Sequence, residues 1–382
     1  MIGLLGGGQL GRMLIQAAHA LDLKVAVLDP DANGPSAQIA DQVIAADYSD
    51  FDALAQLATH ARVFTTEFEN VPAESLRFLA KTGVTMPDAA SVAIAQDRID
   101  EKRFIAGTGV DVAPHAVLTR LEEFDDLSPT LFPGILKSAR LGYDGKGQAR
   151  VHDVAEARTA WIAMGSVPCV LEKRLPLERE ISVICARNAD GDIRIFPVGE
   201  NTHCHGILAV TQVPARISSE LERRAQAAAR SIIDALNYVG VLCVEFFVLS
   251  GGRLVANEMA PRPHNSGHYS IEACLTSQFS QQARICACLP LGETDLVAPA
   301  VMLNVLGDAW FRDGKTAVEP DWDAVRRIPQ TTVHLYGKSD PRPGRKMAHV
   351  TCLGATLAEA RDRARQVALR LGLETGGALD DA

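Results

Sequence analysis

The sequence predicts a protein of mixed class, α/β in its first part and α+β further along, and two patterns support this prediction. In the first part, short apolar segments alternate with helical ones, which is typical of a parallel sheet with helices on both faces. Further along, segments 180–186 and 193–198 and a hairpin around residues 250–252 indicate antiparallel strands. A chain of 382 residues is long enough for two or three domains, each with its own core.

The expected elements follow in order. Residues 2–5 form a strand, the glycine-rich segment 6–11 follows it, and a helix extends to about residue 20. Further strands are expected at 24–28, 43–46 and 63–66, with a helix at 51–60, and Met86-Pro87-Asp88 closes this unit. Helices are expected at 93–108, 218–237, 271–289 and 356–371, with a mixed region at 110–175 and a boundary at 290–299.

Composition excludes several classes of protein. The net charge of −9 argues against a surface for nucleic acid or anionic membrane, although a local basic pocket for a small anion is compatible with it. No apolar run approaches the roughly 18 residues of a membrane span, and no basic leader precedes the first strand. The eight cysteines are scattered among apolar neighbours, and His203-Cys204-His205 has no partner cluster for zinc. We therefore expect free thiols in a reducing cytoplasm.

An acidic hairpin is the most informative feature. Segments 241–249 and 253–258 flank Ser250-Gly251-Gly252. If the two glycines form a two-residue turn, Glu245 lies directly opposite Glu258 on one face of the hairpin. Like charges in that position repel, so the pair predicts a divalent cation, and Mg²⁺ with phosphate oxygens as further ligands fits two carboxylates. The alternative is an ordinary hairpin whose glutamates face solvent.

The segment after this hairpin combines reactive side chains with prolines. Residues 257–269 include Arg262, His264, Asn265 and His268 on an irregular stretch stiffened by two prolines. Loops held by a rigid scaffold often carry reactive groups. Together with the acidic hairpin, this segment predicts a phosphoryl-transfer site.

Three other segments have residues suited to anions or nucleotides. The pattern Gly6-x-Gly8-x-x-Gly11 with Asp29 matches a dinucleotide fingerprint, but the same loop can bind any phosphorylated or carboxylated ligand or be a tight turn without one. Lys137 ends an apolar strand before the glycine-rich loop 142–147, which suits a hairpin over phosphates or a hairpin without ligand. The strand 170–175 can present backbone groups to a purine, with Glu180 for the ribose.

A basic loop lies near the C-terminus. Lys338, Arg342, Arg345 and Lys346 cluster around two prolines. In an acidic protein this loop predicts a pocket for a substrate phosphate, and the alternative is a solvated charged turn.

Taken together, these motifs resemble the ATP-grasp superfamily and, within it, the N5-carboxyaminoimidazole ribonucleotide synthetases. The resemblance runs from end to end, through GGGQLGRML at 6–14, TTEFENVP at 65–72, LGYDGKGQ at 141–148, LEKRLPLEREISVI at 171–184, GENTHCHGIL at 199–208, NEMAPRPHNSGHYSIEAC at 257–274 and HLYGKSDPRPGRKMAHV at 334–350. Leu141 and Ala348 replace glycines often found in the family. Ala260 stands where other ATP-grasp ligases often have an asparagine ligand.

The resemblance implies a fold, a reaction and an assembly. The fold would be an ATP-grasp fold, with an N-terminal parallel domain at 1–95, an ATP-grasp domain at 96–298 (small lobe about 112–175, large lobe about 176–298) and a C-terminal domain at 299–382. The reaction would be ATP-dependent carboxylation of 5-aminoimidazole ribonucleotide with bicarbonate, through carboxyphosphate, in purine biosynthesis. It implies Mg²⁺, with Mn²⁺ as a possible substitute, and a cytoplasmic homodimer that binds neither nucleic acid nor membrane.

The resemblance also implies roles for individual residues. Nucleotide contacts would come from Arg98, Lys137, Gly142, Tyr143, Asp144, Gly145, Lys146, Gly147, Gln148, Glu172, Lys173, Arg174, Leu175, Glu180, His203, Asn257 and Glu258. Glu245 and Glu258 would hold the metal, and Arg262, His264 and Lys137 would be catalytic, with His264 handling a proton. The ribonucleotide would contact Gly8, Gln9, Leu10, Glu69 (or its neighbour Glu67), Tyr143, Asn265, Ser266, His268, Lys338, Arg345 and Lys346.

Three other functions compete with this interpretation. A sibling ATP-grasp ligase with another acceptor would share the ATP half but not the loops at 262–269 and 338–346. A nicotinamide oxidoreductase would use the first ninety or so residues and leave the acidic hairpin unexplained. A regulatory nucleotide-binding module would not need Arg262 and His264 beside the metal.

Overall fold

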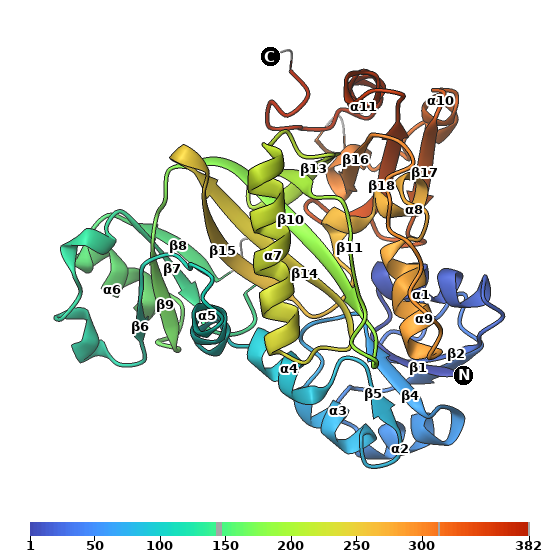
Figure 1. Cartoon of the computed structure of the whole chain (residues 1–382), viewed down its shortest axis with the longest axis horizontal. Helices are drawn as coiled ribbons and strands as arrows, with labels where there is room; N and C mark the ends of the chain where they lie inside the picture. Colours follow the sequence, from blue (N-terminus) through green and yellow to red (C-terminus); the bar gives the residue numbers. More distant parts are fainter. Residues whose placement is uncertain (143–146, 312–313, 381–382) are drawn as a thin grey trace.

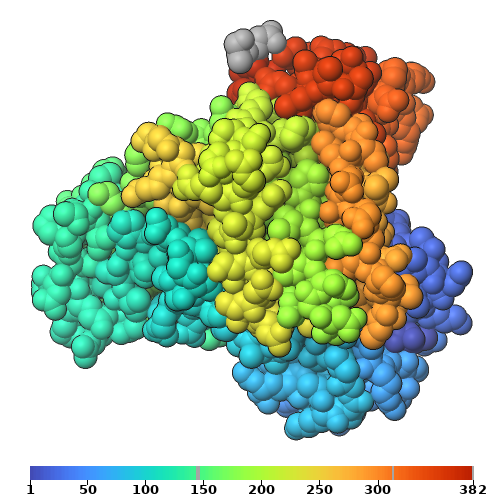
Figure 2. Space-filling view, viewed as in Figure 1, coloured from blue at the N-terminus to red at the C-terminus, as the bar shows by residue number. Residues whose placement is uncertain are grey.

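The computed structural model describes residues 1–142, 147–311 and 314–380, and three sheets organise it (Figure 1). No helix in the part of the chain that the structure describes is long and apolar enough to cross a membrane. Figure 2 shows the small four-stranded unit, in teal, projecting from the rest of the molecule.

The N-terminal sheet is parallel, in the order β3-β2-β1-β4-β5. Its strands are β1 (Ile2–Leu5), β2 (Val25–Asp29), β3 (Gln42–Ala45), β4 (Val63–Thr66) and β5 (Val84–Thr85). Helix α1 (Gln9–His19) covers one face and packs on α9 (Gln278–Cys286), whereas α2 (Phe51–His60) and α3 (Ala73–Leu79) cover the other. The predicted parallel sheet with helices on both faces is confirmed.

A second, antiparallel sheet forms the projecting unit. Its order is β6-β9-β7-β8, with β6 (His115–Leu118), β7 (Gly134–Ser138), β8 (Gln148–Val151) and β9 (Cys169–Lys173). Helix α6 (Val154–Ala163) and the short 3-10 helices η1 (Leu121–Phe124) and η2 (Pro129–Leu131) close its core, where Trp161 packs on Phe124.

The third sheet has nine strands and includes segments from both sides of residue 299. Its order is β15-β14-β10-β12-β13-β16-β18-β17, with β11 paired to β10. The strands are β10 (Leu177–Arg187), β11 (Ile193–Ile195), β12 (Gly199–Cys204), β13 (Ile207–Val213), β14 (Gly240–Leu249), β15 (Arg253–Ala260), β16 (Ala300–Leu306), β17 (Thr331–Leu335) and β18 (Lys346–Leu353). Because β13 pairs with β16, the C-terminal strands extend the same sheet.

Amphipathic helices cover this large sheet. Helix α7 (Ser219–Ala235) buries Leu221, Ala225 and Ile232 against β10 and β14 (Figure 1). Helix α11 (Leu357–Leu371) packs on β16 and β18, with α10 (Trp322–Arg326) and η5 (Gly307–Trp310) at the same end. Burial of these apolar stripes is the main force that holds the layers together.

Two predicted helices are each divided in the structure. The expected helix at 93–108 is α4 (Ala89–Ala95) followed by α5 (Arg98–Gly107), because the Asp97 carboxylate accepts the main-chain N–H of Ile99 at 3.0 Å and starts a new helix. The expected helix at 271–289 is α8 (Ser270–Ala273) and α9, separated by extended backbone at Cys274 and restarted by the Ser277 cap. In both segments a polar residue, Asp97 or Ser277, caps a new helix inside what reads as one continuous helical pattern.

The turn of the acidic hairpin also differs from the prediction. Leu249 pairs with Arg253, so the turn is the three-residue 3-10 segment η3 (Ser250–Gly252) and not Gly251-Gly252 alone. A bulge then inserts Asn257 as an extra residue, and this one-residue shift returns Glu258 to its place opposite Glu245. The predicted glutamate pair is therefore confirmed, although the register that led to it is wrong near the turn.

Candidate functional site

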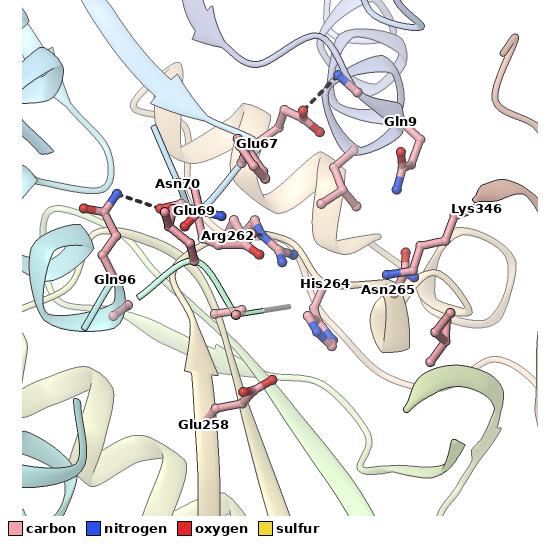
Figure 3. Close-up of a pocket in the computed structure, with 18 of the residues that line it drawn as sticks. Gln9, Glu67, Glu69, Asn70, Gln96, Glu258, Arg262, His264, Asn265 and Lys346 are labelled. Carbon is pink, nitrogen blue, oxygen red and sulfur yellow. Dashed lines mark hydrogen bonds and ion pairs between the residues drawn. The ribbon is translucent and has the colours of Figure 1, made fainter. Parts of the chain in front are cut away.

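A cavity of about 730 Å³ lies where the three sheets meet. Figure 3 shows Gln9 and Lys346 on one side of it and Glu69 and Gln96 on the other. Its lining combines the N-terminal unit (Gly8, Gln9, Leu10, Glu67, Glu69, Asn70), the segment around α5 (Gln96, Arg98, Glu101), the hairpin and its extension (Glu258, Arg262, His264, Asn265) and the C-terminal loop (Lys338, Arg342, Arg345, Lys346). Segments more than three hundred positions apart thus face one space.

The two glutamates of the hairpin have opposite tendencies to ionise. Burial and the neighbouring Glu258 raise the pKa of Glu245. Burial alone would raise the pKa of Glu258 too, but Arg98, whose Nη1 lies 2.9 Å from its carboxylate, and Lys137 hold it low. A cation between the two carboxylates would relieve the repulsion that raises the Glu245 pKa, so the pair suits a divalent ion.

A buried ion cluster lies behind Glu258. Glu172 on β9 accepts hydrogen bonds from Lys137 on β7 and pairs with Lys102 on α5, both at 2.9 Å. Burial opposes the charge on Glu172, but the two ammonium groups lower its pKa to about 2. Lys137 also reaches Asn257 at 3.4 Å, and burial lowers the Lys137 pKa. The cluster therefore joins the small sheet to the acidic hairpin.

Glu180 and His203 form a second pair on the large sheet. The Glu180 carboxylate lies 2.8 Å from His203 Nδ1. Burial would lower the His203 pKa, but the hydrogen bond to Glu180 and nearby Glu245 raise it to about 9. Neither residue lines the cavity described above. Glu180 lies on β10, which pairs with β14 of the acidic hairpin, and His203 lies on β12, the next strand along.

The proline-rich segment projects two side chains into the cavity. Arg262 forms an ion pair with Glu69, and despite burial this pairing raises the Arg262 pKa and lowers that of Glu69. His264 Nε2 lies 3.9 Å from Glu245, and burial with the charge of Arg262 lowers the His264 pKa to about 3. Figure 3 shows both side chains between the N-terminal unit and Glu258.

Ser266 and His268 lie behind the cavity wall. Ser266 Oγ is 2.9 Å from His264 Nδ1, and the whole residue is buried. His268 is also buried, packs against His349 with the two ring centroids 4.6 Å apart and the rings tilted by 37°, and accepts a hydrogen bond from Gln278 at Nδ1. The structure therefore places Asn265 in the cavity lining, whereas Ser266 and His268 lie behind that lining.

The glycine-rich loop of the N-terminal unit is occupied by the protein's own carboxylates. The N–H of Gly7 donates to Asp29, while the N–H groups of Gly8 and Gly11 donate to Glu67 at 2.8 and 3.1 Å. A Cβ on Gly8 would lie 2.7 Å from the Glu67 carboxylate. The donors that a dinucleotide phosphate would use are thus satisfied internally.

The C-terminal basic loop is folded against both the N-terminal unit and its own sheet. Lys338 Nζ donates to Gln9 Oε1 and to the Lys346 carbonyl, each at 2.8 Å. The N–H of Gly344 donates to Asp308 at 2.7 Å, and Arg345 donates to the Asp340 carbonyl at 2.6 Å. These bonds hold the loop as part of the cavity wall.

The remaining expected nucleotide contacts lie in the glycine-rich loop at 142–148 and at the end of β9. Gly142 lines the cavity, Tyr143, Asp144, Gly145 and Lys146 lie outside the described residues, and Gly147 and Gln148 lead into β8. Leu141 also lines the cavity, with a left-handed φ of 60° where the family often has glycine. The N–H groups of Lys173 and Arg174 already donate to main-chain carbonyls, and Leu175 packs beside β14 and β15.

Sequence reasoning missed several residues of the site. Glu101 lines the cavity, accepts the N–H of Met259 and has a pKa raised by burial to about 7. Lys102 is buried in the ion cluster, and Gln278 holds the main chain of His264. The spacing of Glu101 and Lys102, three and four residues after Arg98, would have placed them on its helix face.

The described residues contain no group of three or more His, Cys, Asp or Glu side chains suited to a metal ion. A cation at Glu245 and Glu258 would therefore complete its coordination with oxygens of a bound ligand, as the phosphates of a nucleotide provide.

Comparisons with known proteins cover nearly the whole chain. Residues 1–96 match the ribonucleotide synthetase preATP-grasp domain, residues 103–279 the ATP-grasp domain, and residues 300–363 the phosphoribosylaminoimidazole carboxylase C-terminal domain. An N5-carboxyaminoimidazole ribonucleotide synthase of Brucella melitensis is 45% identical over 92% of this chain and 95% of that protein. One of Bacillus subtilis is 39% identical over 92% and 90%.

Solved structures agree. The N5-carboxyaminoimidazole ribonucleotide synthetase of Thermus thermophilus matches with a TM-score of 0.90 and 36% identity, over 98% of this chain and 99% of that one. The N5-carboxyaminoimidazole synthase of Aspergillus clavatus, solved with ADP and 5-aminoimidazole ribonucleotide, matches with a TM-score of 0.88 and 31% identity, over 97% and 98%.

Proposed function

This chain belongs to the N5-carboxyaminoimidazole ribonucleotide synthase family of ATP-grasp ligases, and from this membership we propose how its own residues carry out the family's reaction. ATP and bicarbonate react to give carboxyphosphate and ADP. The exocyclic amine of 5-aminoimidazole ribonucleotide then takes the carboxyl group and phosphate leaves.

Glu245 and Glu258 would hold Mg²⁺, or Mn²⁺ in its place. Carboxylate oxygens are hard ligands that suit either ion. The two carboxylates face each other, so their mutual repulsion would fall with a cation between them. The cation would neutralise charge on the β- and γ-phosphates of ATP when bound. Arg98 and Lys137, which now face Glu258 and Glu172, lie where they would balance the remaining phosphate charge.

The nucleoside would lie beside β9 and β10. Glu180 would accept hydrogen bonds from the ribose hydroxyls, and His203, held charged by Glu180, would contact phosphate or ribose oxygens. The carbonyl groups at the end of β9 would meet the purine edge, since the N–H groups of Lys173 and Arg174 are engaged elsewhere. The small sheet and the large sheet would thus enclose the nucleotide between them.

Bicarbonate and the ribonucleotide would occupy the cavity. Arg262, kept rigid by Glu69, would orient bicarbonate for attack on the γ-phosphorus, with His264 beside it. Gln9 and Leu10 at the start of α1, with Lys338, Arg345 and Lys346, would hold the ribonucleotide phosphate. Little covalent chemistry is required of the protein, because positioning and charge stabilisation dominate phosphoryl transfer.

One observation supports this proposal above the others. Glu258, which faces Glu245 across the hairpin, pairs with Arg98 and lines the same cavity as Arg262 and the basic C-terminal loop. A sibling ligase with another acceptor would need the acidic pair and Arg98 but not the basic C-terminal loop. A regulatory nucleotide-binding module would need neither Arg262 nor His264. The engaged glycine loop disfavours an oxidoreductase.

A coupled assay tests the function. ADP release should require ATP, bicarbonate and 5-aminoimidazole ribonucleotide together, and ¹³C-bicarbonate should label the product as a carbamate. ADP release that is indifferent to the ribonucleotide would disprove this assignment. A homodimer and a cytoplasmic location, expected from the family, stay predictions that sedimentation and fractionation can test.

A further inference from the structure

The hydrogen bonds around His264 have fixed donor and acceptor roles. The main-chain N–H of Ser266 points at His264 Nδ1 over 3.3 Å, and Ser266 Oγ lies 2.9 Å from the same nitrogen. A main-chain N–H can only donate, so Nδ1 must present its lone pair. A proton on Nδ1 would face the N–H of Ser266 directly. The ring is therefore neutral, with its one proton on Nε2.

The main chain of His264 is also fixed by hydrogen bonds, on both its N–H and its carbonyl group. Gln278, fully buried at the start of α9, accepts the His264 N–H at 2.8 Å and donates to the His264 carbonyl at 2.7 Å. Gly267 leaves room for this amide, since a Cβ there would lie 2.5 Å from Gln278 Oε1. Ser266 is itself buried and lies 3.9 Å from Cys243 Sγ, which can donate to its hydroxyl.

The free N–H of the ring points toward the reaction space. His264 Nε2 lies 3.9 Å from Glu245 Oε1, beyond normal hydrogen-bond length, and the ring lines the cavity beside Arg262 (Figure 3). An anion placed between Arg262 and the acidic pair would therefore meet an N–H donor at this position. It would not meet a lone pair, because Ser266 engages the ring's only one.

We propose that Ser266 is a positioning residue that fixes His264 as the Nε2–H tautomer, so that His264 donates a hydrogen bond to bicarbonate or carboxyphosphate and does not act as a base. The proposal deepens the function proposed above and rests on it. It replaces the expectation that His264 handles a proton, and it assigns the proton of the reacting amine to another acceptor.

Nitrogen NMR tests the tautomer without any assay of activity. In protein labelled with ¹⁵N-histidine, two- and three-bond ¹H–¹⁵N correlations distinguish Nε2–H, Nδ1–H and doubly protonated rings. The His264 signals are identified by their loss in His264→Gln. We expect a neutral Nε2–H ring at neutral pH in the substrate-free protein. A ring protonated on Nδ1, alone or together with Nε2, would overturn the proposal even if the enzyme carboxylates its substrate.

Two substitutions at His264 separate a donor from a base. A glutamine amide can place an N–H near the position of Nε2, whereas alanine has no donor. As a donor, His264→Gln should retain about tenfold more carboxylation than His264→Ala, because one hydrogen bond to an anion is kept. Equal loss in both variants would support a base and contradict the proposal.

Ser266 has a matched control in the N-terminal unit. Ser75 is equally buried and donates one hydrogen bond, to the Tyr48 carbonyl at 2.7 Å. Ser266→Ala should lower kcat by about tenfold and leave KM for ATP unchanged, whereas Ser75→Ala should retain kcat. Ser266→Ala keeps the main-chain N–H at Nδ1 and loses only the hydroxyl, so NMR should show the same neutral Nε2–H tautomer with a changed Nδ1 chemical shift. A variant with unchanged kcat and an unchanged Nδ1 chemical shift would show that the Ser266 hydroxyl does not position the ring.

Discussion

Glu258, a proposed metal ligand, lies between a carboxylate and a guanidinium group. It faces Glu245 across the hairpin, and Arg98 lies 2.9 Å from it on the other side. The arginine keeps it charged without a cation, so the site is prepared to bind one at neutral pH. A neutral amide at this position would leave Arg98 without its partner and remove one of the two proposed metal ligands.

We therefore expect Glu258→Gln to lower ADP release that depends on bicarbonate and ribonucleotide by more than about a hundredfold. The control is Glu220→Gln, an exposed glutamate on α7 paired with Arg223, which should retain the wild-type rate. Turnover by Glu258→Gln at the wild-type rate would remove the metal assignment.

Glu172 makes the fold sensitive to acid. Its pKa is about 2 in the folded protein against 4.5 for the free side chain, so its ionised form stabilises the fold above about pH 4.5, and this contribution falls as the pH drops toward 2. The full contribution is roughly 3 kcal/mol. The difference in unfolding free energy between wild type and Glu172→Gln should narrow by about 2 kcal/mol between about pH 6 and pH 3 in urea titrations. A constant difference would mean that Glu172 is not held ionised by Lys102 and Lys137.

At the scale of elements, the acidic hairpin and the short segment after it decide the geometry of the site. The glutamate pair was predicted from a two-residue turn, and the prediction holds because the longer turn and the extra residue Asn257 offset each other. The bulge at Asn257 could not be predicted, since an extra residue leaves no periodic signal. The divided helices were missed for a related reason: Asp97 and Ser277 are ordinary polar residues until their side chains cap a main chain.

Gly267 tests the rigidity of this segment. A Cβ there would meet Ile184 Cδ1 at 2.2 Å and the Gln278 amide at 2.5 Å, so the support of His264 must move. Gly267→Ala should lower the unfolding free energy by about 1–3 kcal/mol and reduce carboxylation. Gly107→Ala, at the end of α5 where no atom lies within 4 Å of the new Cβ, is the control and should change neither. Equal behaviour of the two variants in thermal unfolding and turnover would contradict the tight packing at Gly267.

For the whole molecule, the site depends on contacts between the two ends of the chain. Lys338 donates to Gln9, and Gln38 donates to the Gly337 carbonyl at 2.7 Å. The residues alone predicted the basic loop and the glycine loop separately, and the family resemblance implied that both contact the ribonucleotide. The folded chain places them around one cavity. Likewise, the spacing of Glu101 and Lys102 indicates the helix face that they share with Arg98, but a polar helix pattern gives no signal that this face is buried.

Ribonucleotide binding should therefore stabilise the whole chain. At a ligand concentration of 100 Kd, 5-aminoimidazole ribonucleotide should add about 2.7 kcal/mol to the unfolding free energy of wild type. Lys338→Ala should lose most of this gain and raise KM for the ribonucleotide, while KM for ATP is retained. Thermal unfolding with each substrate in turn measures both. A parallel loss of stabilisation by ATP would show that Lys338 acts on the fold in general.

The carboxylate of Glu67 under the start of α1 has a consequence for ligand choice. Its oxygens accept the N–H groups of Gly8 and Gly11 at the positive end of the helix, so the glycine-rich loop works here as a structural brace. A nicotinamide cofactor would have to displace this carboxylate to place its pyrophosphate at the loop, so we expect no such cofactor to bind there.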